Sequence, residues 1–257
     1  MSREEHRVRI IPCLLIQNNG LVKTRRFRDA VYLGDPVNAV RIFSDKEVDE
    51  IVVLDIDASK EQREPNYEMI AEIAGECFMP IAYGGGVRSV EQAGRLIRCG
   101  VEKIVINTAA TESYSVIRSL ADRFGSQAVV GAIDVKKTLF GTYRITSRSA
   151  TVEHKIGLDT HVQNLVQAGC GELFLNNVDR DGMMEGFDLA LLSRVSRQVS
   201  VPVVACGGAG RAEHLAEAVR DGGVAAVAAG SMFVFHGRLR AVLINYPKEL
   251  ELFRRGG

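Results

Sequence analysis

The sequence predicts a (β/α)8 barrel, an α/β fold, made of two duplicated half-barrels in one domain that spans residues 1–257. Eight short runs rich in Val and Ile alternate with longer amphipathic stretches, as in a parallel barrel. The length of 257 residues suits one such barrel. Several segments also recur at an offset of about 120 residues, which indicates an internal repeat.

The eight runs are apolar on both faces, which is typical of strands buried in a parallel sheet. We expect strands at Arg9–Ile16, Ile51–Ile56, Pro80–Tyr83, Lys103–Ile106, Ala128–Asp134, Glu172–Leu175, Pro202–Ala205 and Val224–Ala228. The stretches between them predict helices that include Asn66–Glu76, Ser89–Arg98, Ser113–Arg123, Asp188–Arg197 and Arg211–Arg220. Ser89 and Gln92 have the spacing of a helix cap. The polar, alternating stretch Thr138–Val152 predicts a β-hairpin after the fifth strand.

The internal repeat consists of three pairs of similar segments. They are Pro80–Val87 with Pro202–Ala209, Gly100–Asn107 with Gly222–Ala229, and Leu54–Asp57 with Val178–Asp181. Three matches at nearly one offset indicate two four-stranded halves. The main alternative is an open doubly wound sheet, which would place a GxGxxG turn after its first strand. Asn18, Asn19 and Gly20 stand there instead, so the barrel is favoured.

Composition excludes several classes of function. Basic and acidic residues cancel at 32 each, whereas a general binder of nucleic acid or of acidic membranes needs an excess of Lys and Arg. No apolar run reaches the ~18 residues of a membrane span. The five cysteines show neither zinc spacing nor a paired framework, and the opening nine residues are too charged for a secretion signal. We expect a cytoplasmic protein with reduced thiols, no metal and no cofactor.

Glycines at four predicted strand ends indicate phosphate binding. In a barrel, the loops at the carboxyl ends of the strands carry function, and glycines let backbone N–H groups approach an anion. The candidate phosphate-binding residues are Gly85, Gly86, Asn107, Thr108, Gly207, Gly208, Gly230 and Ser231. The repeat groups them into two equivalent sites. A substrate phosphorylated at both ends would fill both, or one site is a remnant of duplication; the alternative is that these glycines only turn the chain.

Acidic side chains at strand ends are candidate acid–base groups. Asp134 ends a purely apolar run and is the candidate catalytic residue, and we expect the nearby Lys136 to keep it ionised. Capping or ion pairing is an equal alternative for the other acids, which are Asp55, Asp57, Asp179 and Asp181.

Taken together, these motifs resemble the cyclase subunit of imidazole glycerol phosphate synthase over essentially the whole chain. The matching segments are Gly34–Pro36, Leu54–Ser59, Gly84–Val87, Ile106–Ala110, Phe124–Ala128, Ala132–Lys136, Asp179–Gly182 and Gly207–Gly210. The resemblance implies two catalytic aspartates, at the ends of strands one and five, and ammonia from a glutaminase on the amino-terminal face. Asp134 matches the second aspartate, but the first falls on Leu15, which cannot transfer a proton.

The same resemblance implies a ring of four charged residues at the amino-terminal end that gates ammonia entry. The matching positions hold Arg9, Glu50, Lys103 and Glu172, all of the expected type. Solvated rim residues are the alternative. Because a barrel interior is normally packed shut, a gated tunnel needs such a device.

Retained gate residues and a lost aspartate resemble a paralogous branch of this family linked to surface-polysaccharide (lipopolysaccharide) biosynthesis. In that branch a separate ATP-dependent amidotransferase takes part, and the implied outcome is conversion of the acetamido group of a nucleotide sugar into an acetamidino group. The segment Leu14–Ile16 followed by Gln17–Lys23 carries this resemblance. Asn176–Asn177, where Thr or Ser is usual, depart from the standard cyclase pattern at the same mouth. The candidate substrate contacts are Lys23, Asp55, Asn176, Asn177 and Asp179.

Three other functions remain open. One is a working cyclase of histidine biosynthesis in which Asp55 or a water replaces the missing aspartate. Another is a non-catalytic conduit that activates the glutaminase. The isomerase of the same pathway is the least favoured, because it too needs an acid where Leu15 stands and has no use for an ammonia gate.

Overall fold

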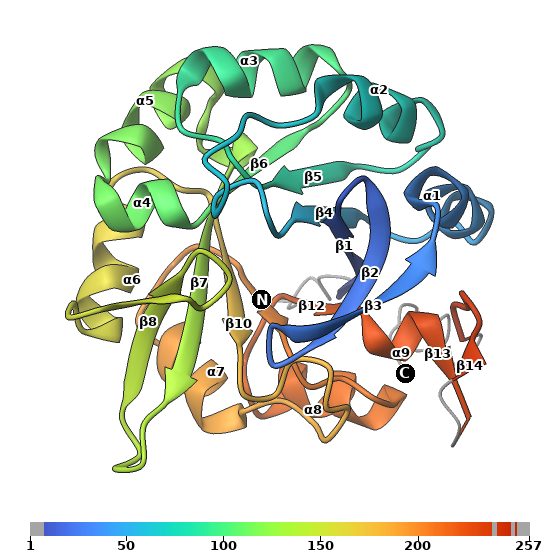
Figure 1. Ribbon diagram of the computed structural model, residues 1–257. Helices are drawn as coiled ribbons and strands as arrows, with labels where there is room; N and C mark the ends of the chain where they lie inside the picture. The colour runs from blue at the N-terminus through green and yellow to red at the C-terminus, as the bar shows by residue number, and fades with distance from the viewer. Residues whose placement is uncertain (1–7, 238–240, 248–249, 251–257) are drawn as a thin grey trace, which may run out of the picture.

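The computed structural model describes residues 8–237, 241–247 and 250, and its centre is a closed ring of eight parallel strands (Figure 1). The ring consists of β1 Arg9–Gln17, β4 Ile51–Asp55, β5 Ile81–Gly84, β6 Lys103–Ile106, β7 Val129–Lys137, β10 Glu172–Asn177, β11 Val203–Cys206 and β12 Ala226–Ala229. Pairing of β12 with β1, Arg9 opposite Ala226, closes it. The predicted (β/α)8 barrel is therefore confirmed, with all eight strands where they were expected. The charged opening segment 1–7 lies outside the described residues.

Helices form the outer layer of the barrel (Figure 1). They are α1 Pro36–Asp45, α2 Tyr67–Gly75, α3 Val90–Arg98, α4 Thr108–Glu112, α5 Ser115–Phe124, α6 Leu158–Gln167, α7 Leu189–Ser196, α8 Ala212–Arg220 and α9 Ser231–Val234. A 3-10 turn at Ser126–Ala128 and a small ribbon of β13 Phe235–His236 with β14 Ala241–Val242 complete the described elements. In the part of the chain that the structure describes, no helix has the length and apolar character that a membrane crossing requires.

Side-chain caps fix where several of these helices begin. The hydroxyl of Ser89 accepts from the backbone N–H of Gln92 at 3.3 Å, as its spacing predicted. The carboxylate of Asp35 accepts from the N–H of Asn38 at 2.8 Å, one residue before Pro36, which occupies the first helical turn.

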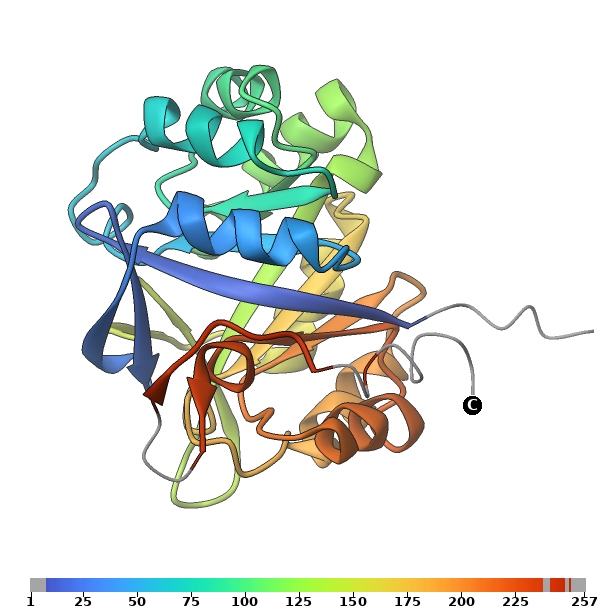
Figure 2. The same cartoon turned by 90° about the vertical axis from the view of Figure 1, so that its right-hand side faces the viewer.

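Two hairpins extend from the strand ends of the barrel. The predicted hairpin after the fifth strand is confirmed by β8 Tyr143–Ser147 and β9 Val152–His154. The second, β2 Gly20–Arg25 with β3 Arg28–Gly34, was not predicted. Its own turn uses Arg26 and Phe27, with φ of 52° and 60°, whereas Asn18 and Asn19, with φ of 49° and 61°, reverse the chain from β1 into β2. The Asn-Asn-Gly sequence of that preceding turn is the signal that could have revealed β2. Figure 2 shows this hairpin at the end of the barrel opposite the start of β1.

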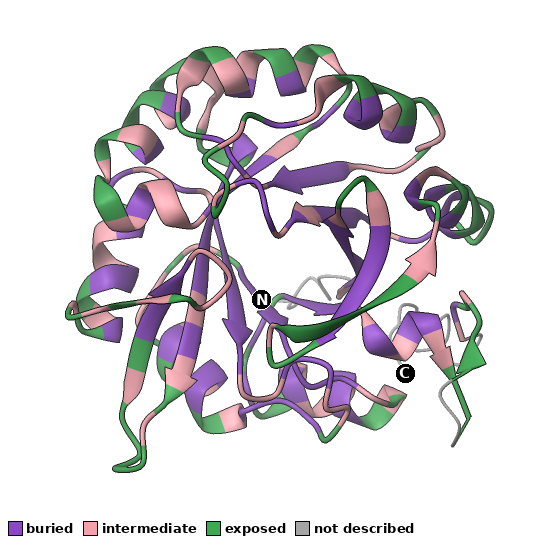
Figure 3. Cartoon of the chain, in the orientation of Figure 1, coloured by how far each residue is buried: buried purple, intermediate pink, exposed green. Residues whose placement is uncertain are grey.

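The chain has two apolar cores. The larger lies between the strands and the helices, and the smaller fills the inside of the barrel. Figure 3 shows the strands of the barrel largely buried and the outer helix faces exposed. Small side chains, such as Ala82, Ala132 and Ala228, occupy several inward positions. Of these, Ala132 lines a cavity at the carboxyl end of the barrel, where a bulky side chain would take up the space.

Candidate functional site

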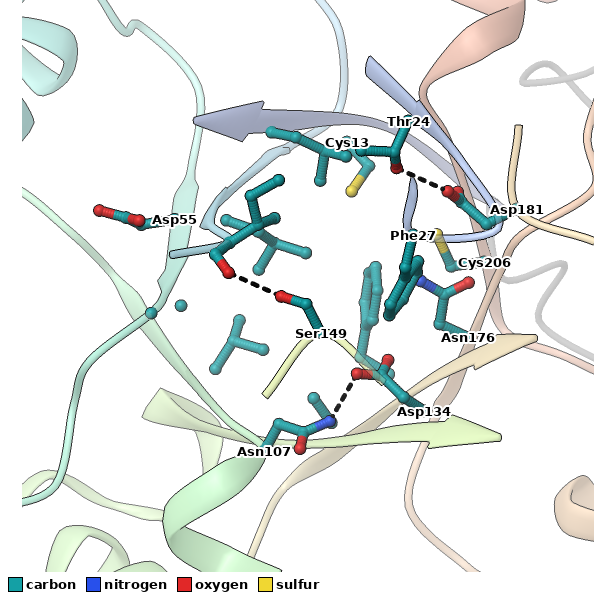
Figure 4. Close-up of a pocket in the computed structure, with 18 of the residues that line it drawn as sticks. Cys13, Thr24, Phe27, Asp55, Asn107, Asp134, Ser149, Asn176, Asp181 and Cys206 are labelled. Carbon is teal, nitrogen blue, oxygen red and sulfur yellow. Dashed lines mark hydrogen bonds between the residues drawn. The ribbon is translucent and has the colours of Figure 1, made fainter. Parts of the chain in front are cut away.

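A cavity occupies the mouth of the barrel at the carboxyl ends of the strands (Figure 4). All eight candidate phosphate-binding residues line it. Two of them show why glycine is required: Gly85 has φ of +127° and a Cβ there would lie 2.5 Å from the carbonyl oxygen of Asp55. Gly208 has φ of +126°, and its Cβ would lie 2.2 Å from the carbonyl oxygen of Gly186. Close backbone packing thus accounts for these glycines, and phosphate binding stays a prediction.

The two predicted anion sites have similar backbones. Asn107 precedes α4 with φ/ψ of −114°/−79°, and Gly230 precedes α9 with −111°/−68°. The sites differ in their hydrogen bonds. The N–H of Gly86 donates to the hydroxyl of Ser59 at 3.3 Å. Ser59 was not among the site residues predicted from the sequence. The hydroxyl of Ser231 is buried and has no hydrogen-bond partner among the described residues, so it is available to a ligand.

Asp134 points into the cavity from the end of β7. Its Oδ2 accepts from Nδ2 of Asn107 at 2.9 Å. Burial, reinforced by the Asp181 carboxylate, raises the pKa of Asp134 to about 7, although the Asn107 hydrogen bond acts in the opposite direction. The expectation that Lys136 keeps Asp134 ionised is wrong. Nζ of Lys136 instead donates to the carbonyl oxygen of Ala150 at 3.3 Å.

Leu15 lies inside the barrel and lines the same cavity. It pairs with Leu54 of the neighbouring strand, and the thiol-bearing Cys13 precedes it on the same face. The β1 side of the mouth is therefore apolar. Because Leu15 lines the cavity, the residue type at this position bears directly on the chemistry of the mouth.

Asp55 is held by ion pairing and capping. Its two carboxylate oxygens accept from Nη1 and Nη2 of Arg63 at 2.8 and 2.9 Å. Its Oδ1 also accepts from the N–H of Ala58 at 3.0 Å. The hydrogen bond to Asp55 raises the pKa of Arg63. Asp55 lines the cavity, but these bonds satisfy its carboxylate and favour the structural alternative for this residue.

Lys23 and Asp181 form a buried ion pair at the mouth. Nζ of Lys23 lies 2.9 Å from Oδ1 of Asp181, and each side chain is about 5% exposed. The hydroxyl of Thr24 donates to the other oxygen of Asp181 at 3.1 Å (Figure 4). Burial is the largest influence and acts to lower the pKa of Lys23, but the Asp181 carboxylate together with Cys13 and Cys206 raises this pKa overall. The sequence placed Lys23 on a loop; it lies on β2 and lines the cavity with Asp181.

The remaining candidate contacts divide into two groups. Asn176 lines the cavity next to Asp134, its register partner on β7, and its Oδ1 is buried with no hydrogen-bond partner among the described residues. Asn177 and Asp179 do not line the cavity. Nδ2 of Asn177 donates to Asp188 at 3.3 Å, and Oδ2 of Asp179 accepts from the N–H of Lys137 at 2.7 Å. Their substrate contact stays a prediction, and Asp181 lines the cavity.

The four predicted gate residues meet at the opposite end of the barrel. Arg9 donates to both Glu50 and Glu172. Nζ of Lys103 donates to the two oxygens of Glu50 at 2.9 and 2.8 Å and to Glu172 at 3.1 Å. The side chains thus form a closed ring of alternating charge, with the two glutamates nearly buried and the two cations partly exposed. The ring lies at the amino-terminal ends of the barrel strands; its role as an ammonia gate stays a prediction.

The thiols and carboxylates suggest no further centre. All five cysteines are free, and Cys13 and Cys206 line the cavity. Contact with Cys13 and burial raise the pKa of Cys206, so this thiol is protonated. Within residues 8–237, 241–247 and 250, no group of three or more His, Cys, Asp or Glu side chains is arranged to hold a metal ion.

Comparison with known proteins agrees with this architecture. The family model described as "Histidine biosynthesis protein" matches residues 9–240. The chain is 54% identical over 241 residues to the "Putative imidazole glycerol phosphate synthase subunit hisF2" of Pseudomonas aeruginosa, which covers 94% of this chain and 96% of that protein. It is 40% identical over 233 residues to the "Imidazole glycerol phosphate synthase subunit HisF" of Streptomyces coelicolor, covering 91% and 92%. The chain therefore belongs to the HisF family of imidazole glycerol phosphate synthase subunits.

Proposed function

We propose that this chain is a synthase subunit that receives ammonia through its charged ring and delivers it to a phosphorylated substrate at the mouth of the barrel. The ammonia would come from a HisH-type glutaminase on the amino-terminal face. The product would be an acetamidino group made from the acetamido group of a nucleotide sugar, with an ATP-dependent amidotransferase activating the amide. The observation that carries this proposal is the combination of a complete ring of Arg9, Glu50, Lys103 and Glu172 with a mouth where Leu15 faces Asp134.

The mouth suits attack by ammonia on an activated amide. The activated amide is an imidate whose oxygen carries the activating phosphate group. Ammonia adds to the imidate carbon, and the C–O bond breaks as the phosphate group leaves with the bonding electrons. The new nitrogen must then lose one proton to give the amidine. Asp134, with a pKa of about 7, can accept that proton near neutral pH. One acid–base group is enough for this step, and the apolar wall at Leu15 and Leu54 helps to exclude competing water.

The standard cyclisation fits the mouth less well. It uses two carboxylates, and loss of one acid–base group typically removes about 100- to 10,000-fold of rate. Asp55 is a poor substitute, because Arg63 occupies both of its oxygens. Asp181 is likewise committed to Lys23 and Thr24.

Nitrogen tracing tests the proposal. The chain, its glutaminase and the amidotransferase are supplied with amide-labelled 15N-glutamine, nucleotide sugar, ATP and excess unlabelled ammonium. We expect 15N in the amidine product of the native chain. Lys103→Met should lower the labelled fraction, while the exposed Lys46→Met serves as the control. Product nitrogen drawn mainly from free ammonium in the native complex would contradict the proposal.

Two further measurements separate the alternatives. The aminoimidazole precursor of the histidine pathway, supplied with ammonium salt, should give little imidazole product, and turnover near that of a standard cyclase would overturn our assignment. Asp134→Asn should slow amidine formation at least about 100-fold. A complex indifferent to that substitution would instead support the non-catalytic conduit.

A further inference from the structure

The cations around the cavity are distributed unevenly. Among the described residues, the cavity lining includes three basic side chains, Lys23, Arg88 and Arg148. Lys23 is neutralised by Asp181, with which it shares a buried contact. The two arginines lie beside the predicted anion site at the ends of β5 and β6, which we call the β5–β6 rim and define by Gly85, Gly86, Asn107 and Thr108.

Arg88 stands two residues after Gly86 of the β5–β6 rim. Its backbone N–H donates to the side chain of Gln92 at 2.7 Å, which anchors the residue at the start of α3. The residue is exposed, and its guanidinium forms no ion pair with another described residue. Arg88 therefore contributes an uncompensated positive charge to this side of the mouth.

Arg148 reaches the same rim from the loop between β8 and β9. Three consecutive residues of this loop, Arg148, Ser149 and Ala150, have φ of 50°, 53° and 61°, a conformation that non-glycine residues rarely adopt even singly. Contacts with the barrel hold them there. The hydroxyl of Ser149 donates to the carbonyl oxygen of Ile56 at 2.6 Å (Figure 4), and the N–H of Arg148 donates to the hydroxyl of Thr108 at 3.3 Å. Such concentrated strain is typical of ligand-binding segments.

The guanidinium of Arg148 is weakly engaged. Its Nη2 lies 3.0 Å from Oε1 of Glu112, and the two side chains are 35% and 56% exposed. Ion pairs this exposed contribute little stability. An anion in the cavity could therefore replace Glu112 as the partner of the guanidinium with little loss of stability. Glu112 also lines the cavity, which keeps Arg148 next to the rim until a ligand arrives.

The opposite rim has no comparable charge. The site at the ends of β11 and β12 is lined by Gly207, Gly208, Gly230 and Ser231. Its basic neighbour is Lys23, whose Cε would lie 3.0 Å from a Cβ on Gly230, and that lysine is already paired. Although the two sites have similar backbones, one carries two guanidinium groups and the other offers backbone amides and a hydroxyl.

We infer that the β5–β6 rim binds two adjacent phosphates through Arg88 and Arg148, and that the rim at β11 and β12 binds the less charged end of the same ligand. Each of the two guanidinium groups can form a bidentate pair of hydrogen bonds with one phosphate. Two adjacent phosphates can therefore bind both groups, whereas a single phosphate cannot form both bidentate pairs fully. The inference deepens the proposed function, because the diphosphate of a nucleotide sugar would orient its sugar across the mouth toward Asp134. The inference does not depend on the charged ring at the amino-terminal end of the barrel.

Binding of inorganic pyrophosphate and orthophosphate to the isolated full chain tests this inference by calorimetry at fixed pH and ionic strength. We expect pyrophosphate to bind at least about tenfold more tightly than orthophosphate. Arg88→Ala and Arg148→Ala should each weaken pyrophosphate binding about tenfold and orthophosphate binding much less. Glu112→Gln should strengthen pyrophosphate binding, since it releases Arg148. Arg211→Ala removes an exposed arginine outside this cavity and should change neither affinity.

Equal affinity for the two anions, or arginine variants that bind pyrophosphate like the native chain, would overturn the inference. Circular dichroism of each variant excludes unfolding as the cause of lost binding. Because no glutaminase, ammonia or ATP enters the measurement, this result is independent of the nitrogen-tracing experiment. Failure of ammonia transfer with intact pyrophosphate selectivity would reject the proposed function alone.

Discussion

The side-chain amide of Asn107 donates to the carboxylate of Asp134 at 2.9 Å, linking the ends of β6 and β7 inside the mouth. This hydrogen bond favours the ionised acid, yet burial and the nearby Asp181 carboxylate outweigh it and set the pKa of Asp134 to about 7. The residue that we propose as proton acceptor is therefore also a source of pH-dependent stability.

Stability should fall as pH rises, and Asp134→Asn should remove part of that fall. Between the ordinary pKa of 3.8 and the folded value of about 7, the folded state binds a proton that the unfolded state has released. Raising the pH through this window lowers the free energy of unfolding of the native chain by at most about 4 kcal/mol. Thermal denaturation from pH 4 to 8 should show the variant gaining stability relative to the native chain. Asp159→Asn is the control, because the Arg194 hydrogen bond lowers the pKa of Asp159 and gives the opposite sign. Parallel pH profiles for Asp134→Asn and the native chain would contradict the assignment.

Breaking the charged ring should destabilise the chain more than breaking a surface pair. Glu50 is 2% exposed and accepts from both Arg9 and Lys103, so Glu50→Gln leaves two cations with one carboxylate. We expect a loss of about 2 kcal/mol in the free energy of unfolding, less than for a fully buried pair because both cations are partly exposed. Urea denaturation measures it. Glu76→Gln breaks the exposed pair with Arg41 and should change stability little; equal effects would argue against a cooperative ring.

Docking of the β2–β3 hairpin depends on Gly182. This residue has φ of +74°, and a Cβ would lie 2.2 Å from the carbonyl oxygen of Thr24. Gly182→Ala should cost about 3 kcal/mol, because it adds a backbone clash to the strain of a left-handed alanine. Gly141→Ala is the control, because Gly141 has a similar φ of +81° but nothing lies within 4 Å of its Cβ position. We expect this variant to lose about 1 kcal/mol in the free energy of unfolding. Chemical denaturation of the two variants would show similar losses if the hairpin did not contact the Gly182 loop.

The Lys23–Asp181 pair should behave as a unit. Lys23→Met leaves a buried carboxylate without its cation, at a cost of about 3–5 kcal/mol at pH 7. Adding Asp181→Asn removes the stranded charge and should recover most of that loss, because Thr24 can still bond to the amide. A double-mutant cycle by urea denaturation measures the coupling. Strictly additive losses would indicate that the two side chains do not interact in solution.

Sequence reasoning reached the barrel because its signal is periodic and local. Runs such as Ile51–Ile56 are apolar on both faces wherever a strand is buried on both sides, and the repeat doubles the evidence. The ring of Arg9, Glu50, Lys103 and Glu172 came from the resemblance, and strand pairing brings the four side chains together. The β2–β3 hairpin lies outside the repeating pattern of eight strands, and its local signal is the Asn-Asn-Gly turn that leads from β1 into β2.

The sequence alone determined the strand order, the position of Leu15 where an acid would be expected, and the identity of Asp134 as the strand-end acid. Tertiary structure decided which polar groups share the cavity. Asp179 and Asp181 are two residues apart, yet the backbone N–H of Lys137 captures Asp179 while Lys23 and Thr24 hold Asp181 at the mouth. The direction of a side chain and the pKa of Asp134 depend on desolvation and on neighbours from distant strands, which no local pattern encodes.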